Sequence, residues 1–425
     1  FRTNIVDNKD VELVNLNEDE YNRFEQKNPK GSFYQSVLQK KYYEDSHQDS
    51  YLLGVKEKDE VLLTALMRKI KNHTGDVYEI TGGPLVDFEN ENNNQIIAFF
   101  LKELHKYLKK QHAYYLRIVP NEKTQRVENN GKVVNYDLKN YSSLYFAEGF
   151  IYRSFEQVGY GFATPHYEYQ KRIEGLNKKT LFQSYSKKTQ YSIKKTYEFG
   201  ITTRNISYDE LEMFHENTTK TAKRLGFYDK ELSYYQSVYR TFGDNAKFMI
   251  AEINLSDYIG HFQEIIRNLK DKIDQMILID SKREKPTKTR QIKELRSQVE
   301  QHEKRIVQAK KLIEQYGKKI NLAGALFFIQ PQEVSYMFSY TNAEFKNFYG
   351  PYRTQADMLE FALKEKVPVY NFYGVSGDRS GHDGVYEFKK GFQGYMVDNM
   401  GAFILPINKF RYQFLQTIKK IIRRR

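Results

Sequence analysis

The chain has 425 residues, of which 40% are hydrophobic and 28% charged, enough for two or three domains with packed cores. Its formal net charge of +13 indicates an anionic partner. The absence of cysteine excludes disulfides, thiolate metal sites, iron–sulfur clusters and a cysteine nucleophile. The sequence has no apolar run near the roughly 20 residues of a membrane span, and no signal-peptide pattern, Walker A loop, His-Glu-x-x-His or G-x-G-x-x-G. We therefore expect a cytoplasmic protein with neither metal nor cofactor.

Predicted helices and strands alternate along the chain in a similar order in each half. Helices are expected at residues 17–27, 94–110, 141–148, 187–198, 208–225 and 355–365. Strands are expected at residues 50–56, 61–71, 114–119, 246–253, 322–330, 334–339 and 369–373. The order predicts an α+β fold with two structurally related domains, although the sequence shows no clear internal repeat.

The most regular segment, residues 256–320, predicts two long helices. Its apolar residues recur at alternating steps of three and four, the spacing of a coiled-coil seam. The two runs are Ile259, Phe262, Ile266, Leu269, Ile273 and Met276, then Ile292, Leu295, Val299, His302, Ile306, Ala309, Ile313 and Tyr316. Pro286 lies between the runs and opposes a continuous helix, so we expect an antiparallel hairpin inserted between two strands. The segment has 16 Lys and Arg against 10 Asp and Glu, a net charge of +6.

Four short stretches carry a resemblance to a known family. They read ITGGPLVDF at residues 80–88, SKKTQYSIKK at 186–195, YNFYGVSG at 370–377 and GVYEFKKGF at 384–392. Together with the inserted hairpin, they resemble the FemABX family of peptidoglycan bridge-forming aminoacyltransferases (FemA, FemB, FemX, MurM) over nearly the whole chain. The resemblance implies two tandem GNAT-like (acyl-CoA N-acyltransferase-like) domains with an inserted antiparallel coiled-coil arm.

The predicted elements and the resemblance divide the chain into five segments. Residues 1–150 form the first GNAT-like unit, and residues 151–255 and 321–410 form the two parts of the second. Residues 256–320 form the arm, and residues 411–425 form a basic C-terminal tail.

The resemblance also implies a reaction and its partners. The chain is similar to enzymes that move an amino acid (Gly, Ala or Ser) from aminoacyl-tRNA to the stem-peptide lysine of a lipid II-like peptidoglycan precursor. This transfer builds the interpeptide bridge. The arm would bind tRNA, although such hairpins also bind proteins or set domain spacing. The basic tail would either contact the cytoplasmic membrane face or serve as a solubilising end. Pairing as a homo- or heterodimer with related transferases is a further expectation.

The fourth stretch holds the expected catalytic residue, Lys389. By its sequence alone, Lys389 would be a surface lysine on a late strand. The resemblance instead implies that it faces the substrate channel and stabilises charge in the transition state, with Phe388 structural beside it. Gly374 is expected to wall the channel, and Tyr352 and Tyr373 to line the acceptor site.

A basic patch lies on the predicted helix at residues 187–198. Lys188, Lys194 and Lys195 belong either to a solvated helix face or, as the resemblance implies, to a contact with the precursor's diphosphate.

The chain also departs from the family. Val119-Pro120 stands where the family usually has Asp-Pro, whose Asp is a candidate general base, and Gly82 replaces an arginine. The base is then dispensable, or Glu122 or another residue replaces it, or the chain is a non-catalytic or altered homologue that binds tRNA or the precursor.

An acyl-CoA N-acetyltransferase is the weaker alternative, because the segment EQVGYG at residues 156–161 begins with Glu instead of the Gln or Arg of a CoA-binding turn.

Overall fold

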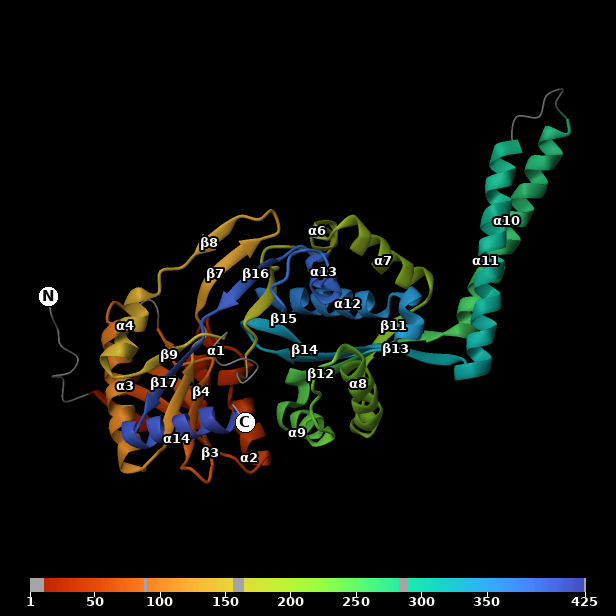
Figure 1. Cartoon of the computed structure of the whole chain (residues 1–425). Helices are drawn as coiled ribbons and strands as arrows, with labels where there is room; N and C mark the ends of the chain where they lie inside the picture. Colours follow the sequence, from red (N-terminus) through yellow and green to blue (C-terminus); the bar gives the residue numbers. More distant parts are fainter. Residues whose placement is uncertain (1–10, 88–89, 156–163, 283–288, 424–425) are drawn as a thin grey trace.

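Two mixed β-sheets lie side by side, and a pair of long helices projects from the second (Figure 1). The computed structural model describes residues 11–87, 90–155, 164–282 and 289–423, with side chains to residue 418. The segment EQVGYG, Pro286, Arg424 and Arg425 therefore lie outside the described residues. None of the helices in those ranges combines the length and the apolar character needed to cross a membrane.

The first sheet has eight strands in the order β1-β2-β3-β4-β6-β17-β9, with β5 paired to β3. These strands are β1 (Val11–Asn15), β2 (Asp49–Glu57), β3 (Glu60–Ile70), β4 (Val77–Thr81), β5 (Leu85–Val86), β6 (Tyr115–Val119), β9 (Ile151–Arg153) and β17 (Ala402–Pro406). Its helices are α1 (Glu18–Lys27), α2 (Val37–Asp45), α3 (Asn93–Lys110), α4 (Lys139–Ala147) and α14 (Lys409–Arg423).

Helices α1 and α3 form for reasons visible in the sequence. The Asn17 side chain accepts a hydrogen bond from the Glu20 main-chain N–H, and the Glu20 carboxylate accepts one from the Asn17 N–H, which together cap the first turn of α1. Apolar residues at helical spacing put one face of α3 into the core of the first sheet; they are Ile96, Ile97, Phe100, Leu101, Leu104 and Leu108.

The second sheet has nine strands in the order β11-β12-β13-β14-β15-β10-β16-β7-β8. They are β7 (Lys123–Glu128), β8 (Val133–Asn135), β10 (Tyr167–Arg172), β11 (Thr202–Asn205), β12 (Ala246–Asn254), β13 (Lys319–Ile329), β14 (Glu333–Thr341), β15 (Val369–Val375) and β16 (Tyr395–Asn399). Helices α7 (Lys187–Glu198), α12 (Gly350–Lys364) and α13 (Gly384–Lys390) lie on one side of this sheet, and α8 (Leu211–Leu225) and α9 (Leu232–Phe242) lie on the other (Figure 1). The short helix α6 (Lys178–Ser184) precedes α7.

The two sheets share strands across the expected domain boundary at residue 150. Strands β7 and β8 come from the first third of the chain but pair in the second sheet, where β7 joins β16. In return, β17 from the end of the chain joins β6 in the first sheet. This exchange ties the two halves together and brings the segment after β6 to the edge of a cavity described below. The division at residue 150 stays a prediction.

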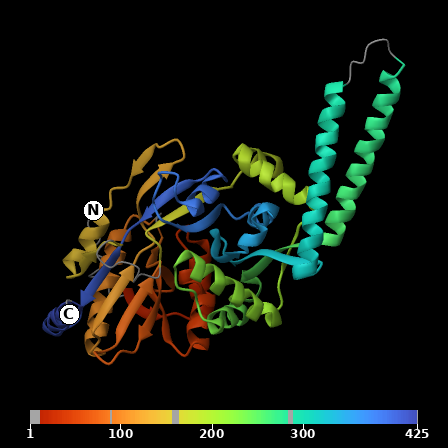
Figure 2. The same cartoon turned by 45° about the vertical axis from the view of Figure 1, so that its right-hand side comes forward.

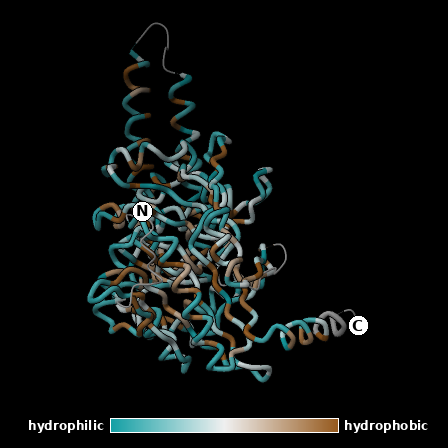
Figure 3. The backbone as a smooth tube through the Cα atoms, turned by 90° about the vertical axis from the view of Figure 1, so that its left-hand side faces the viewer, coloured by the Kyte–Doolittle hydropathy of each residue, from teal (hydrophilic) through white to brown (hydrophobic). Residues whose placement is uncertain are grey.

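The inserted arm consists of α10 (Leu255–Asp280) and α11 (Thr289–Tyr316), which run antiparallel (Figures 1 and 2). Hydrophilic and hydrophobic residues alternate along both helices (Figure 3). The buried residues of their contact belong to the predicted runs; they are Phe262, Ile266, Ile273, Val299, Ile306 and Ala309. Residues 319 and 320, predicted to end the arm, are instead the first residues of β13.

Candidate active site

The stretch NFYG lies on β15, where the strand is irregular. Strand β15 pairs with β10 so that Tyr373 faces Tyr169 while Asn371 faces Gln170, which leaves Phe372 as an extra residue. Such a β-bulge redirects the side chains beside it. Tyr373 accordingly has a positive φ of 64°, and its N–H donates a hydrogen bond to Asn371 Oδ1 over 2.8 Å. The motif therefore fixes the direction of both side chains.

Lys389 is buried, with 6% of its surface exposed, on helix α13. The sequence-based alternative of a surface lysine on a late strand is wrong, because the Asp383 side chain caps the N-terminus of a helix there. Lys389 Nζ donates a hydrogen bond to the main-chain oxygen of Gly374 over 2.6 Å and lies 5.5 Å from the Tyr336 ring centroid. Burial lowers the pKa of Lys389 to about 7, against the opposing effect of Asp383 and Glu168.

Two cavities share a wall near this lysine, which itself lines neither of them; its contact, Gly374, lines the second. The first, which we call the carboxylate cavity, has a volume of about 200 Å³, and its lining includes Glu168 and Glu333. The second, the aromatic groove, has a volume of about 790 Å³, and its lining includes Gly374. Tyr34, Thr164 and Tyr373 line both. The Tyr34 and Tyr373 hydroxyls are hydrogen-bonded to each other at this boundary.

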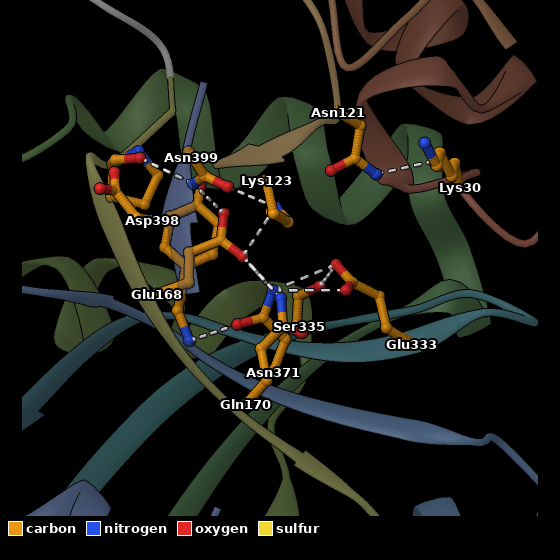
Figure 4. Close-up of polar contacts among 12 residues, drawn as sticks. Lys30, Asn121, Lys123, Glu168, Gln170, Glu333, Ser335, Asn371, Asp398 and Asn399 are labelled. Atoms are coloured by element: carbon orange, nitrogen blue, oxygen red, sulfur yellow. Dashed lines mark hydrogen bonds and ion pairs between the residues drawn. The ribbon is translucent and has the colours of Figure 1, made fainter. Parts of the chain in front are cut away.

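Glu168 is a buried carboxylate surrounded by donors (Figure 4). Its oxygens accept hydrogen bonds from the side-chain amides of Asn371 and Gln170, each over 2.9 Å, and of Asn399 over 2.8 Å. Lys123 Nζ lies 3.7 Å from Glu168 Oε2. Although burial alone would raise the pKa of Glu168, Lys123 and the three amides hold it below its ordinary value. Glu168 is therefore a fixed negative charge.

Glu333, at the start of β14, is the second carboxylate of the cavity (Figure 4). It accepts a hydrogen bond from Ser335 Oγ over 2.8 Å, and Asn371 Nδ2, already bonded to Glu168, lies 3.3 Å from Glu333 Oε2. Burial and the neighbouring charge of Glu168 raise the pKa of Glu333 above its ordinary value. Two carboxylates that share one amide donor thus have opposite pKa shifts.

The segment after β6 forms another wall of the carboxylate cavity. Val119 is the last residue of β6 and is buried, so it offers no proton acceptor. Glu122, considered above as a replacement, forms an ion pair with Lys30. Asn121 Nδ2 donates a hydrogen bond to the Lys30 main-chain oxygen over 2.7 Å, which ties this segment to the one that follows α1 (Figure 4).

The expected aromatic residues Phe388 and Tyr352 pack against each other, with ring centroids 4.9 Å apart in an edge-to-face arrangement. Both pack against the core of the second sheet, and neither lines the two cavities. Their contact packs α13, which carries Lys389, against α12.

The basic patch lies on α7, outside both cavities. Lys188 and Lys194 are exposed, and Lys194 Nζ lies 5.7 Å from the Phe182 ring centroid. Lys195 Nζ forms a 2.6 Å ion pair with Glu198. The start of α7 adjoins the end of α13 through a 2.9 Å hydrogen bond from the Ser186 N–H to the Gly391 oxygen. The patch is thus a separate, neighbouring surface.

No sequence pattern pointed to Glu168, Glu333, Asn371 or Lys123 as site residues. Asn371 lies within a quoted motif, so its position was a usable signal. Glu168, Glu333 and Lys123 come from three strands, β10, β14 and β7, which only the folded sheet brings together.

The fold and the family of the chain follow from comparison with known proteins. The crystal structure of FemX superposes with a TM-score of 0.76 and 20% identity, covering 95% of this chain and 99% of that one. The predicted α+β fold with two tandem GNAT-like domains is confirmed by this likeness. The model of the FemAB family matches residues 16–420, so the chain belongs to the FemAB family. Aminoacyltransferase FemA of Staphylococcus aureus strain bovine RF122 / ET3-1 is 28% identical over 422 residues, 97% of this chain and 99% of the relative. The FemA of strain N315 is 27% identical over the same shares.

Proposed function

We propose that the chain is a non-ribosomal aminoacyltransferase that moves an amino acid from aminoacyl-tRNA to the stem-peptide lysine of a lipid-linked peptidoglycan precursor. Family membership over residues 16–420 and the FemA relatives support transfer of an aminoacyl group in peptidoglycan bridge formation. One structural observation carries the proposal. Two of the stretches that carry the resemblance meet where Lys389 Nζ contacts the oxygen of Gly374, which lines the aromatic groove.

The chemistry of the site suits this reaction. An aminoacyl ester is already activated, so the protein must orient the acceptor amine, remove its proton and stabilise the oxyanion that forms. Lys389, with a pKa of about 7, exists in both protonation states near neutrality. Its ammonium form would donate to the developing oxyanion from a buried position, where such a contact is strongest.

The arm supports the choice of tRNA as donor. It projects away from both sheets (Figure 2), and its two helices contain 10 of the 16 basic and 9 of the 10 acidic residues of the +6 segment, so most of the excess positive charge lies at residues 281–288 and 317–320. Exposed lysine and arginine side chains along such a helical pair can neutralise the phosphates of a nucleic-acid backbone without base recognition.

Helix α14 supports contact with the surface that holds a lipid-linked acceptor. Tyr412 is buried against the rings of Tyr114 and Tyr115. Phe410 and Phe414 are 87% and 65% exposed among basic residues, so α14 is amphipathic with an apolar face turned to solvent. Exposed aromatics flanked by basic residues favour an interface with anionic lipid.

The test is a transfer assay with tRNA charged with labelled Gly, Ala or Ser and a lipid-linked muropeptide. The proposal expects label in the muropeptide with at least one charged tRNA. If none of the three charged tRNAs supports transfer, although a known transferase uses both substrates, the chain is better described as a non-catalytic homologue that binds them.

A further inference from the structure

The carboxylate cavity has unsatisfied polar groups in addition to its two carboxylates. Ser32 Oγ and Gln332 Oε1 line it, are 5% and 9% exposed as residues, and have no hydrogen-bond partner among the described residues. Buried polar atoms are rarely left unpaired, because each unpaired atom destabilises the folded protein. A cavity of about 200 Å³ with such atoms in its wall is suited to a small polar group such as an amine.

The two carboxylates of this cavity differ in how their hydrogen-bonding capacity is filled. Glu168 accepts three amide hydrogen bonds of 2.8–2.9 Å and lies beside Lys123. Glu333 has one hydrogen bond of that quality, from Ser335, and a longer contact of 3.3 Å from the shared Asn371 amide. Glu333 therefore keeps lone pairs available on the side that lines the cavity.

From this geometry we propose that Glu333 accepts the proton lost by the acceptor amine during aminoacyl transfer, with Glu168 and Asn371 as positioning residues. This assignment rests on the proposed function. It gives the chain a proton acceptor where Val119 has removed the usual candidate and where Glu122 is paired with Lys30.

The groups around Glu333 suit it to that role. Among the described residues, six titratable groups face Glu333 or share its cavity: Glu168 of β10, Lys123 of β7, Tyr395 of β16, Tyr373 of β15, and Lys30 and Tyr34 of the segment between α1 and α2. Lys123 opposes the effect of Glu168, but burial and Glu168 prevail and raise the pKa of Glu333. A carboxylate with a raised pKa is a stronger base than an ordinary one near neutral pH.

The step conserves atoms and charge. The acceptor ammonium first loses one proton to solvent. Its nitrogen then forms the new C–N bond to the ester carbonyl carbon, and a second proton passes from this nitrogen to a Glu333 oxygen. The C–O bond to the ribose oxygen breaks, and that oxygen takes the proton from Glu333, which is then ionised again.

The test compares single-turnover transfer by the full chain at several pH values. Glu333→Gln keeps the size of the side chain and an acceptor oxygen for Ser335 Oγ but removes the base. Transfer should fall ~100-fold or more, with little change in the apparent KM for either substrate. In the wild type, the log rate should fall on the acidic side with a slope of about two, because the acceptor amine and Glu333 both take up a proton, and Glu333→Gln should keep only the slope of about one that the amine sets. Glu333→Asp should recover part of the rate.

The matched control is Glu252→Gln, since Glu252 is also buried in the second sheet but is paired with Arg204 and lines neither cavity. It should transfer at the wild-type rate. A folded Glu333→Gln with the wild-type rate and pH profile would overturn the inference and leave the proposed function standing. If Glu333→Gln does not fold, Glu333→Asp decides, because an unchanged rate and acidic limb would also overturn it. No transfer by the wild type would instead overturn the proposed function and this inference together.

Discussion

Lys389 Nζ and the Gly374 main-chain oxygen are 2.6 Å apart, although 15 residues separate them in the sequence. The contact joins helix α13 to the bulged end of β15. It holds an ammonium group in a buried position, where its charge is costly to maintain. A buried lysine with a lowered pKa next to a cavity is a common sign of a functional site.

Replacing this lysine should slow transfer. We expect Lys389→Ala to lower turnover at least about tenfold, because the oxyanion loses a donor. The matched control is Lys390→Ala, because Lys390 is adjacent and its Nζ only lies over the Tyr386 ring at 5.9 Å. Single-turnover rates and thermal melts measure both effects. A folded Lys389→Ala with wild-type turnover would remove Lys389 from the site.

The stability of the fold should depend on pH through Glu25. Burial raises the pKa of Glu25 from 4.5 to about 8, although the Gln332 side chain opposes the rise. Between these values the folded state binds more protons than the unfolded state, so the free energy of unfolding falls as pH rises. Glu25→Gln should remove this pH-dependent loss of stability. Above pH 8 it should raise the free energy of unfolding by on the order of 1–3 kcal/mol.

Denaturant unfolding at several pH values measures this contribution. The control is Glu18→Gln, on the exposed start of the same helix, which should keep the wild-type pH dependence. A Glu25→Gln curve parallel to that of the wild type would contradict the assignment.

Charge reversal on the arm should weaken tRNA binding. Arg296 and Lys310 are exposed on α11. The double variant Arg296→Glu/Lys310→Glu should bind tRNA more weakly. The slope of log K against log salt concentration should decrease in magnitude by about one for each phosphate contact that is lost. Lys364→Glu, an exposed reversal on α12, is the control. A salt slope equal to that of the wild type would return the arm to a protein-docking role.

The exposed face of α14 should govern binding to lipid. Phe410→Ser/Phe414→Ser should reduce co-flotation with vesicles that contain phosphatidylglycerol, while the thermal melt stays near that of the wild type. Phe146→Ser removes a 52% exposed ring from α4 and serves as the control. Equal flotation of the double variant and the wild type would show that α14 is only a solubilising end.

Local rules were enough to predict several elements of the fold. The cap at Asn17 and the apolar spacing of α3 and of the arm involve neighbours along the chain, so the sequence displays them directly. Strands β7 and β8 were not predicted, because β7 pairs with β16, more than 250 positions away, and β8 joins the sheet through β7.

The candidate site was predictable only in part. The motifs pointed to Lys389, Tyr373 and Gly374, which the fold brings together. The pair Glu168 and Glu333 had no local signal, since a glutamate in a polar, basic sequence is ordinarily solvated. Its unusual environment arises from the parallel pairing of β14 with β15 and the antiparallel pairing of β10 with β15.

The most direct test of the account is to locate the added residue on the acceptor. After incubation of the full chain with charged tRNA and the lipid-linked muropeptide, tandem mass spectrometry identifies the nitrogen that carries the new amino acid. We expect one or more added residues on the side-chain amine of the stem lysine with the wild type, and at least about tenfold less product with Lys389→Ala. An unmodified lysine amine with every charged tRNA, under conditions in which a known transferase modifies it, would contradict the account.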